Sequence, residues 1–138
     1  MAERSERNQA VIDEFRANSG RVGGRWEGGQ LLLLTTTGAK SGRRRTTPVV
    51  YMTDAARLLV FASHGGRPTS PDWYHNLVAN PTVTVEVGNE KYEAKAAVLS
   101  GEERDRLYAL QAEKAPAFAQ YQANTSRKIP VVALEKAT

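Results

Sequence analysis

Residues 31–53 read LLLLTTTGAKSGRRRTTPVVYMT, and this stretch decides the fold. Four leucines followed by threonines are typical of a strand that is covered on both faces, which we expect over residues 30–36. The glycine-bounded segment Gly38–Gly42 ends that strand, and residues 46–53 resume β-character. A turn at Asp54–Arg57 and a strand over residues 58–63 then predict an antiparallel hairpin, so three strands of one sheet follow one another.

The middle of the chain predicts a short helix and a second hairpin. Ser70-Pro71-Asp72 is a helix start in which Ser70 caps the first free amides, and Asn80-Pro81 ends this helix. Residues 82–87 and 91–99 alternate in polarity around Gly88-Asn89, which predicts a tight hairpin.

The last third predicts two helices and a final strand. Ser100 and Glu103 match a capping box that opens a helix reaching about residue 113, and Pro116 separates it from a second helical piece running toward Ala123. Residues 129–134 form the last strand. This order, without βαβ alternation, favours an α+β fold built on an antiparallel barrel of about six strands.

The chain is expected to form one compact domain, since its 138 residues are 41% hydrophobic. Residues 1–20 are assigned to an N-terminal helix or extension and residues 21–138 to the barrel. Within the first segment, residues 4–15 place Ala10, Val11 and Phe15 among many charges, which predicts a short amphipathic or frayed helix rather than a core element.

Composition excludes several kinds of site. There is no cysteine, and His64 and His75 are the two histidines, so neither a disulfide framework nor a metal site is expected. No export signal and no apolar run of about 20 residues is visible, so we expect a cytoplasmic protein without a membrane span, and peripheral contact with a membrane stays open.

The strongest functional feature is a local concentration of positive charge. The formal net charge is +4, and residues 28–53 contain Lys40, Arg43, Arg44 and Arg45 but no acid. Flanking glycines let backbone amides approach an anion, Ser41 adds a hydroxyl, and the cations add charge-assisted bonds to phosphate or carboxylate. The spacing is not that of a Walker loop, and a solvated basic turn is the alternative interpretation.

Two further segments suit a flat cofactor. In FASHGG, residues 61–66, an apolar strand ends in glycines, where a planar ring finds apolar contact and exposed amides; an ordinary glycine turn is the alternative. In PDWYHN, residues 71–76, a helix N-terminus attracts anions, although Trp73 is more often a core residue and His75 more often a surface one. The spacing presents no nucleophile, base and orienting group, so chemistry here requires a cofactor.

At these residues the chain resembles the deazaflavin-dependent nitroreductase family, which has a split β-barrel fold and uses the reduced deazaflavin coenzyme F420. The resemblance rests on four stretches in register: LLLLTTTGAKSGRRRTTPVVY, VFASHGGRPTSPDWYHNLVANPTVTVEVG, SGEERDRLY and FAQYQANTSRKIPVVALE. They cover roughly residues 31–135.

The resemblance implies a cofactor site with distinct parts. Lys40, Ser41 and Arg45 would hold the phosphate and acidic tail. The other implied contacts are Ala39, Thr46, Thr47, Pro48, Val49 and Val50 along the linker, Phe61, Ala62, Ser63 and His64 at the ring, Asp72, Trp73, Tyr74, His75 and Asn76 around the pocket, and Tyr121 on its far side. Ser63 and Tyr121 are the candidates for polarising the acceptor or relaying a proton.

The chain departs from the family pattern at two places. His64 stands where members often carry lysine, and the aromatic substrate wall is reduced to Ala115 and Phe118. A quinone is the preferred acceptor, with nitroaromatics and enones left open. We expect a monomer or weak homodimer acting on a small-molecule acceptor.

Two alternatives are weighed against this reductase. FMN could replace F420 on the same barrel. A basic module that binds nucleic acid is disfavoured, because four cations neutralise at most about four phosphates and predict a log–log salt slope shallower than roughly −4.

Overall fold

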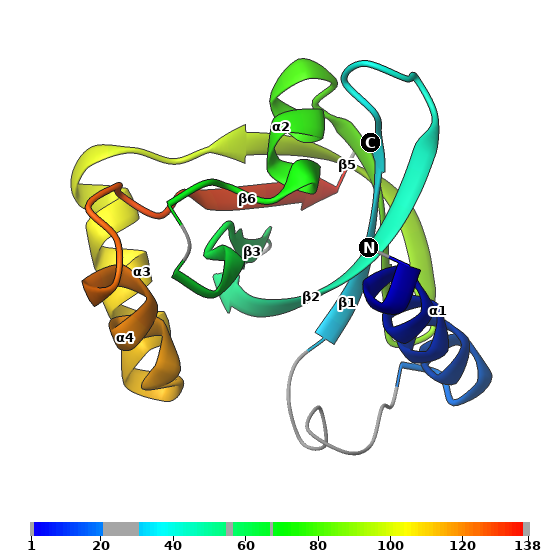
Figure 1. Ribbon diagram of the computed structural model, residues 1–138, viewed down its shortest axis with the longest axis horizontal. Helices are drawn as coiled ribbons and strands as arrows, with labels where there is room; N and C mark the ends of the chain where they lie inside the picture. Colours follow the sequence, from blue (N-terminus) through cyan, green and yellow to red (C-terminus); the bar gives the residue numbers. More distant parts are fainter. Residues whose placement is uncertain (1, 21–30, 55–56, 67, 137–138) are drawn as a thin grey trace.

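The protein is a closed six-stranded antiparallel barrel with helices around it (Figure 1). The computed structural model describes residues 2–20, 31–54, 57–66 and 68–136, with side chains of the first helix described from residue 9. The strands are β1 (Leu31–Thr37), β2 (Arg44–Asp54), β3 (Arg57–Phe61), β4 (Thr82–Val87), β5 (Glu90–Val98) and β6 (Val131–Lys136), in the spatial order β1-β2-β3-β6-β5-β4. The expected α+β antiparallel barrel is confirmed.

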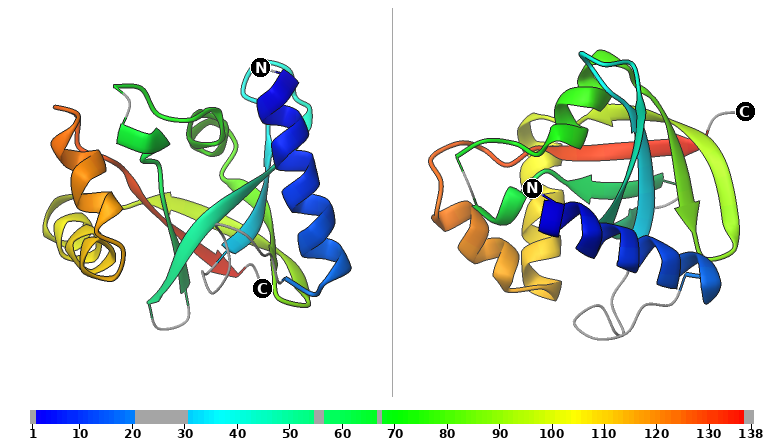
Figure 2. Two further views of the ribbon diagram at one scale, coloured as in Figure 1. Left: turned by 60° about the horizontal axis from the view of Figure 1, so that its bottom comes forward. Right: turned by 45° about the vertical axis from the view of Figure 1, so that its right-hand side comes forward.

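The helices occupy three places around this barrel. They are α1 (Ala2–Ala17), the 3-10 turn η2 (His64–Gly66), α2 (Asp72–Ala79), α3 (Gly101–Lys114) and α4 (Ala117–Ala123). Figure 2 shows α1 against the side formed by β1 and β2, with α3 and α4 together on the far side of the barrel. The short helix α2 lies near the bend between β1 and β2, which places it beside the candidate site (Figure 1).

Strand β1 is covered on both faces, as its run of leucines predicts. Leu32 and Leu34 point into the barrel core, while Leu31 and Leu33 pack on the outside with α1. All four leucines are buried. The same alternation carries across to β2, because Leu34 pairs with Thr47 and Thr36 pairs with Arg45.

Both predicted hairpins are present, with boundaries that shift by one or two residues. Strands β2 and β3 pair through Tyr51 and Val60, and β4 pairs with β5 through Val85 and Tyr92. The last strand starts at Val131 rather than residue 129, since Ile129 and Pro130 belong to the segment that approaches it.

Helix α1 corrects the expectation of a frayed, non-core element. Ile12 and Phe15 are buried, Phe15 with 2% of its surface exposed, against Leu31 and Leu33. A bidentate ion pair joins Arg16 to Glu86 of β4, with N–O distances of 3.0 and 2.8 Å. The helix therefore completes the outer hydrophobic layer. The boundary at residue 20 stays a prediction, because residues 21–30 lie outside the described part.

The predicted helix caps are wrong in detail. The cap position of α2 is Pro71, whose side chain has no hydrogen-bonding group, and the hydroxyl of the preceding Ser70 accepts from Arg127. Ser100 does occupy the cap position of α3 but makes no capping bond. Glu103 pairs with Arg57 of β3 at 2.6 Å, so the capping box does not form.

Candidate functional site

The cations predicted from the sequence lie on the bend between β1 and β2, which we call the cationic bend (residues 38–45). Lys40, Ser41, Arg43 and Arg45 are exposed there. Among the described residues, no ion pair involves Lys40, Arg43 or Arg45. The bend therefore presents positive charge that no carboxylate of the described chain neutralises.

The backbone of the cationic bend differs from the sequence-based expectation. Four of its amides already donate within the protein: Gly38 N–H to the Arg43 carbonyl, Gly42 N–H to the Gly38 carbonyl, Ala39 N–H to Asn76 Oδ1 and Arg43 N–H to Ser41 Oγ. The expectation that these glycine-flanked amides cradle an anion is wrong for these four groups. The side chains of the bend offer further donors for an anion: the ammonium, the guanidinium groups and the Ser41 hydroxyl, which can still donate its proton.

Helix α2 holds the cationic bend in place. The Asn76 side chain accepts from Ala39 N–H at 3.0 Å and donates to the Thr36 hydroxyl at 3.2 Å. One turn further, Asn80 donates to the Thr37 carbonyl at 3.3 Å. Asn76 was predicted as a pocket residue; its amide here positions the loop that carries Lys40.

Neighbouring arginines on β2 face opposite sides of the sheet. Arg45 pairs with Thr36, whose side chain is buried and bonded to α2, so Arg45 stands on the α2 side. Arg44 pairs with Thr37 and donates to the Thr84 hydroxyl on the outer face. Of the two, Arg45 is the one placed to share a ligand with α2.

Residues 46–50 follow the same alternation along β2. Thr47 and Val49 continue the inner face of Arg45, where Val49 packs against the barrel core, while Thr46 bonds the Thr35 hydroxyl outside. Val50 on the outer face packs against α1. These side chains alternate between the two faces of β2, and their role as linker contacts stays a prediction.

The second predicted segment, residues 61–66, is a sharply bent strand end. His64 has a positive φ of 49° and Gly66 one of 82°, which turns the chain directly after β3 into η2. Gly66 N–H closes the turn on the Ser63 carbonyl at 2.9 Å, and His64 Nδ1 lies 3.0 Å from the Thr69 carbonyl. Ser63 and His64 are half-buried at this turn.

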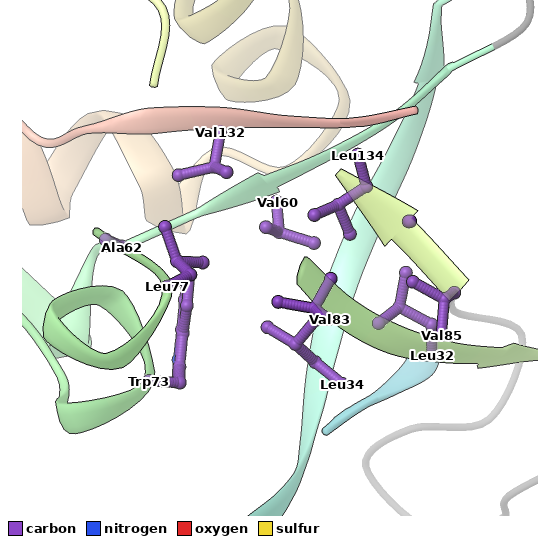
Figure 3. Close-up of a cluster of buried hydrophobic side chains, with 11 residues drawn as sticks. Leu32, Leu34, Val60, Ala62, Trp73, Leu77, Val83, Val85, Val132 and Leu134 are labelled. Atoms are coloured by element: carbon purple, nitrogen blue, oxygen red, sulfur yellow. The ribbon is translucent and has the colours of Figure 1, made fainter. Parts of the chain in front are cut away.

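Phe61, Ala62 and Trp73 are buried. Phe61 packs edge-on to Tyr108 and Phe118, with ring centroids 5.9 and 5.6 Å away, in the cluster under α3 and α4. Ala62 and Trp73 face the opposite way, into the barrel core (Figure 3). Trp73 has 7% of its surface exposed, in keeping with the core role usual for tryptophan. Their cofactor contacts stay predictions.

Tyr121 lies next to the strand end. A side-chain carbon added to Gly66 would come within 2.9 Å of the Tyr121 carbonyl, so α4 and η2 touch backbone to backbone. The Tyr121 ring stacks edge-on to Phe118 at 5.3 Å. The fold thus brings the segment of Ser63 and the helix of Tyr121 together, although they are far apart in sequence.

Helix α2 connects the cationic bend with this strand end. Ser70, directly before the helix, is joined to the strand end through Arg127, and Asn76 reaches the bend. With a rise of about 1.5 Å per residue, the first helical residue Asp72 and Asn76 are about 6 Å apart along the helix. Tyr74 is half-buried, while Asp72 and His75 are exposed.

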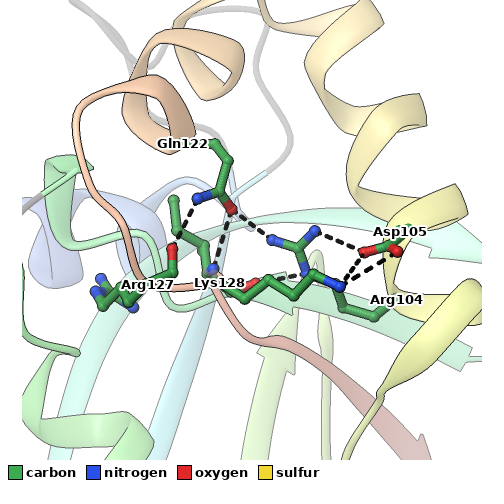
Figure 4. Close-up of polar contacts among 6 residues, drawn as sticks. Arg104, Asp105, Gln122, Arg127 and Lys128 are labelled. Carbon is green, nitrogen blue, oxygen red and sulfur yellow. Dashed lines mark hydrogen bonds and ion pairs between the residues drawn. The ribbon is translucent and has the colours of Figure 1, made fainter.

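Sequence reasoning missed the residues that hold the strand end from the C-terminal side. Arg127 donates to the carbonyls of Ala62 and Ser63, and Gln122 bonds the backbone of the segment that carries it (Figure 4). Burial lowers the pKa of the Arg127 guanidinium, which still stays charged near neutral pH. A single arginine in the run Ser126-Arg127-Lys128 carries no spacing signal that would have revealed this.

Comparison with known proteins gives concordant matches. The sequence model of the family described as F420H(2)-dependent quinone reductase matches residues 7–136. An F420H(2)-dependent quinone reductase of Mycobacterium tuberculosis is 43% identical over 126 residues, which cover 88% of this chain and 85% of that protein.

Two solved structures are similar in fold and sequence. One described as an F420-H2 dependent reductase (FDR-A) has a TM-score of 0.70 and 42% identity, covering 77% of this chain and 94% of that chain. Another, described as a domain-swapped dimer, has a TM-score of 0.73 and 36% identity, covering 98% and 100%. Separately, none of the helices in the described residues is both long and apolar enough to cross a membrane.

Proposed function

Because the chain belongs to the F420H(2)-dependent quinone reductase family, we propose that it reduces a small-molecule acceptor, first of all a quinone, with the reduced deazaflavin coenzyme F420. When bound, this coenzyme supplies the hydride. The protein's own residues have to bind the coenzyme, orient the acceptor, exclude water and supply a proton.

The observation that carries the proposal is the cationic bend. Lys40 and Arg45 are exposed and form no ion pair with described residues, and Arg45 shares a face with the α2 contact at Thr36. Ammonium and guanidinium groups form charge-assisted hydrogen bonds to phosphate and carboxylate oxygens. The donor set therefore fits a coenzyme with a phosphate and an acidic tail.

Ser63 and Tyr121 are proposed to act on the acceptor. Both residues are half-buried, and their segments meet at Gly66. A hydroxyl at this place can donate a hydrogen bond to an acceptor oxygen and pass on a proton as the hydride arrives. A Ser63→Ala variant should then lower kcat for quinone reduction more than it changes coenzyme affinity.

The cofactor assignment is tested by titrating F420 and FMN side by side into the purified protein. Lys40→Ala should weaken F420 binding by ~1.5–3 kcal/mol, or roughly 10–150-fold in Kd, because a charge-assisted contact is lost. Lys95→Ala is the matched control, since Lys95 is an exposed lysine of β5 that stands opposite Glu135 in the strand register. Tighter binding of FMN than of F420 would favour the FMN alternative.

Acceptor choice is tested by following loss of reduced-coenzyme absorbance with quinones, nitroaromatics and enones at equal concentration. We expect the highest kcat/KM for a quinone. A mobility-shift experiment at low salt checks the nucleic-acid alternative, for which the proposal expects no complex.

We propose that the protein is a monomer or a weak homodimer. The relative described as a domain-swapped dimer supports a dimeric form. Sedimentation velocity over a hundredfold concentration range separates the two, since a weak homodimer shows a concentration-dependent shift and a monomer does not; a species larger than a dimer contradicts both.

A further inference from the structure

We infer that Arg127 is a positioning residue for the ring-binding end of the site: its guanidinium fixes the strand end of Ser63 relative to the start of α2. The inference rests on the proposed function only in taking this end of the site as the place of the deazaflavin ring. Arg127 itself is not proposed to touch the coenzyme.

The guanidinium joins two chain segments, the end of β3 and the residues directly before α2. Its Nη2 lies 3.1 Å from the Ala62 carbonyl and 3.0 Å from the Ser63 carbonyl at the end of β3. The same nitrogen lies 3.1 Å from the Thr69 carbonyl, and Nη1 lies 3.1 Å from Ser70 Oγ, directly before α2. An arginine carries its donors on separate nitrogens held in one plane, so Nη1 and Nη2 reach different acceptors, whereas a lysine carries all three of its donors on one nitrogen.

Two of the carbonyls that accept from Arg127 also take part in the turn that follows Ser63. The Ser63 carbonyl accepts from Gly66 N–H as well, closing η2, and the Thr69 carbonyl faces His64 Nδ1. His64 has a left-handed φ of 49°, a conformation that a residue with a side chain keeps only when its surroundings enforce it. Removing the guanidinium would leave several carbonyl groups without their charged donor, so the turn should loosen.

The backbone around Arg127 is itself held by hydrogen bonds from α3 and α4. Gln122 of α4 donates to the Arg127 carbonyl at 2.7 Å and accepts from Ile129 N–H at 3.1 Å. Arg104 of α3, which is buried, donates to the same Gln122 oxygen and to the Ile129 carbonyl (Figure 4). Helices α3 and α4 therefore fix the backbone of residues 127–129. Because the Arg127 guanidinium extends from this fixed backbone, its hydrogen bonds restrict the movement of the strand end.

The test compares Arg127→Met, which keeps an unbranched apolar stem but removes the guanidinium and all its donors, with Arg127→Lys and the control Lys128→Met. Lys128 is the neighbouring exposed cation and pairs with Asp105 at 3.2 Å. Two readouts are measured besides thermal stability: hydrogen exchange of the amides in residues 62–66, and the Kd of oxidised F420 from fluorescence quenching. The exchange readout needs no ligand.

Arg127→Met should speed exchange in residues 62–66 and raise the Kd of F420, each roughly tenfold or more, because charge-assisted bonds to several carbonyls are lost. Arg127→Lys should fall between it and the wild type, and Lys128→Met should match the wild type. If Arg127→Met does not fold, Arg127→Lys decides the matter alone.

Wild-type protection of residues 62–66 together with a Kd within twofold in Arg127→Met, or in Arg127→Lys when only that variant folds, would overturn the inference. Failure of the wild-type protein to bind F420 would instead defeat the proposed function, and the exchange measurement would still judge the role of Arg127.

Discussion

Replacing Asn76 by alanine tests whether α2 fixes the cationic bend. The Asn76 amide bonds α2 to the bend through Ala39 N–H at 3.0 Å and to the end of β1 through the Thr36 hydroxyl at 3.2 Å. Thr36 has 1% of its surface exposed, so water cannot readily replace the lost partner. Ala39 is exposed, and its amide can be hydrated after the change.

The expected loss follows from these two environments. A buried polar group left without its partner costs about 1–3 kcal/mol, whereas the hydrated amide adds little. Alanine is the better helix former by about 0.5 kcal/mol, which offsets part of the loss. The net decrease in unfolding free energy should be about 0.5–2.5 kcal/mol, or roughly 2–10 °C in Tm for a chain of this size.

The assay is urea denaturation together with an F420 titration, with Val78→Ala as the control on the same helix. Val78 is 55% exposed, so its truncation should change stability by less than about 0.5 kcal/mol. Asn76→Ala should also raise the Kd of F420, because Lys40 then sits on a looser bend. The reasoning is refuted if Asn76→Ala matches Val78→Ala in stability and binds F420 within twofold of the wild type.

Three further predictions concern the scaffold. Phe15→Ala should cost about 3–5 kcal/mol in urea unfolding, since Phe15 is 2% exposed, and a loss under about 1 kcal/mol would mean that α1 is not docked. The hydrogen bonds from the Arg16 guanidinium lower the pKa of the Glu86 carboxyl. The wild type should therefore have a higher unfolding free energy than Glu86→Gln at neutral pH, and this difference should disappear as the pH falls below about 4.5 and the carboxylate is protonated; a pH-independent difference contradicts this. Gly66→Ala should destabilise more than Gly88→Ala by at least about 1 kcal/mol, because both have positive φ but a Cβ at Gly66 meets the α4 backbone at 2.9 Å; equal losses count against that contact.

The sequence predicts best those elements whose signal is local. The four leucines of β1 already imply two apolar neighbours, and the alternation of residues 82–87 around Gly88 implies the β4–β5 hairpin. Closure of the barrel depends on pairings between distant segments, such as Val60 with Val132 and Leu34 with Val85, which no local pattern encodes.

The burial of helix α1 and the failure of the two caps escaped prediction for a related reason. Ile12 and Phe15 are too few for a strong helical stripe, and their burial depends on the outer face of Leu31 and Leu33. Serine is a residue type that often caps helices, but the Ser70 hydroxyl accepts a hydrogen bond from Arg127, 57 residues later in the chain. In both cases a tertiary contact outweighs the local preference.

The candidate site divides in the same way. The cations of the bend are visible as charge in the sequence, whereas the use of its amides depends on turn geometry that the sequence does not specify. The positioning roles of Asn76 and Arg127 become apparent only when the segments they bridge are seen together.

The central claim is that the α2 side of the cationic bend binds the acidic part of F420, and the adjacent pair Arg44 and Arg45 tests it most directly. Isothermal titration of F420 should give a Kd roughly 10–150-fold weaker for Arg45→Ala, which loses a charge-assisted contact. Arg44→Ala should lose less than about fivefold, because that guanidinium lies on the outer face with Thr84. Equal affinities in both variants and the wild type, or a larger loss in Arg44→Ala, would contradict the account.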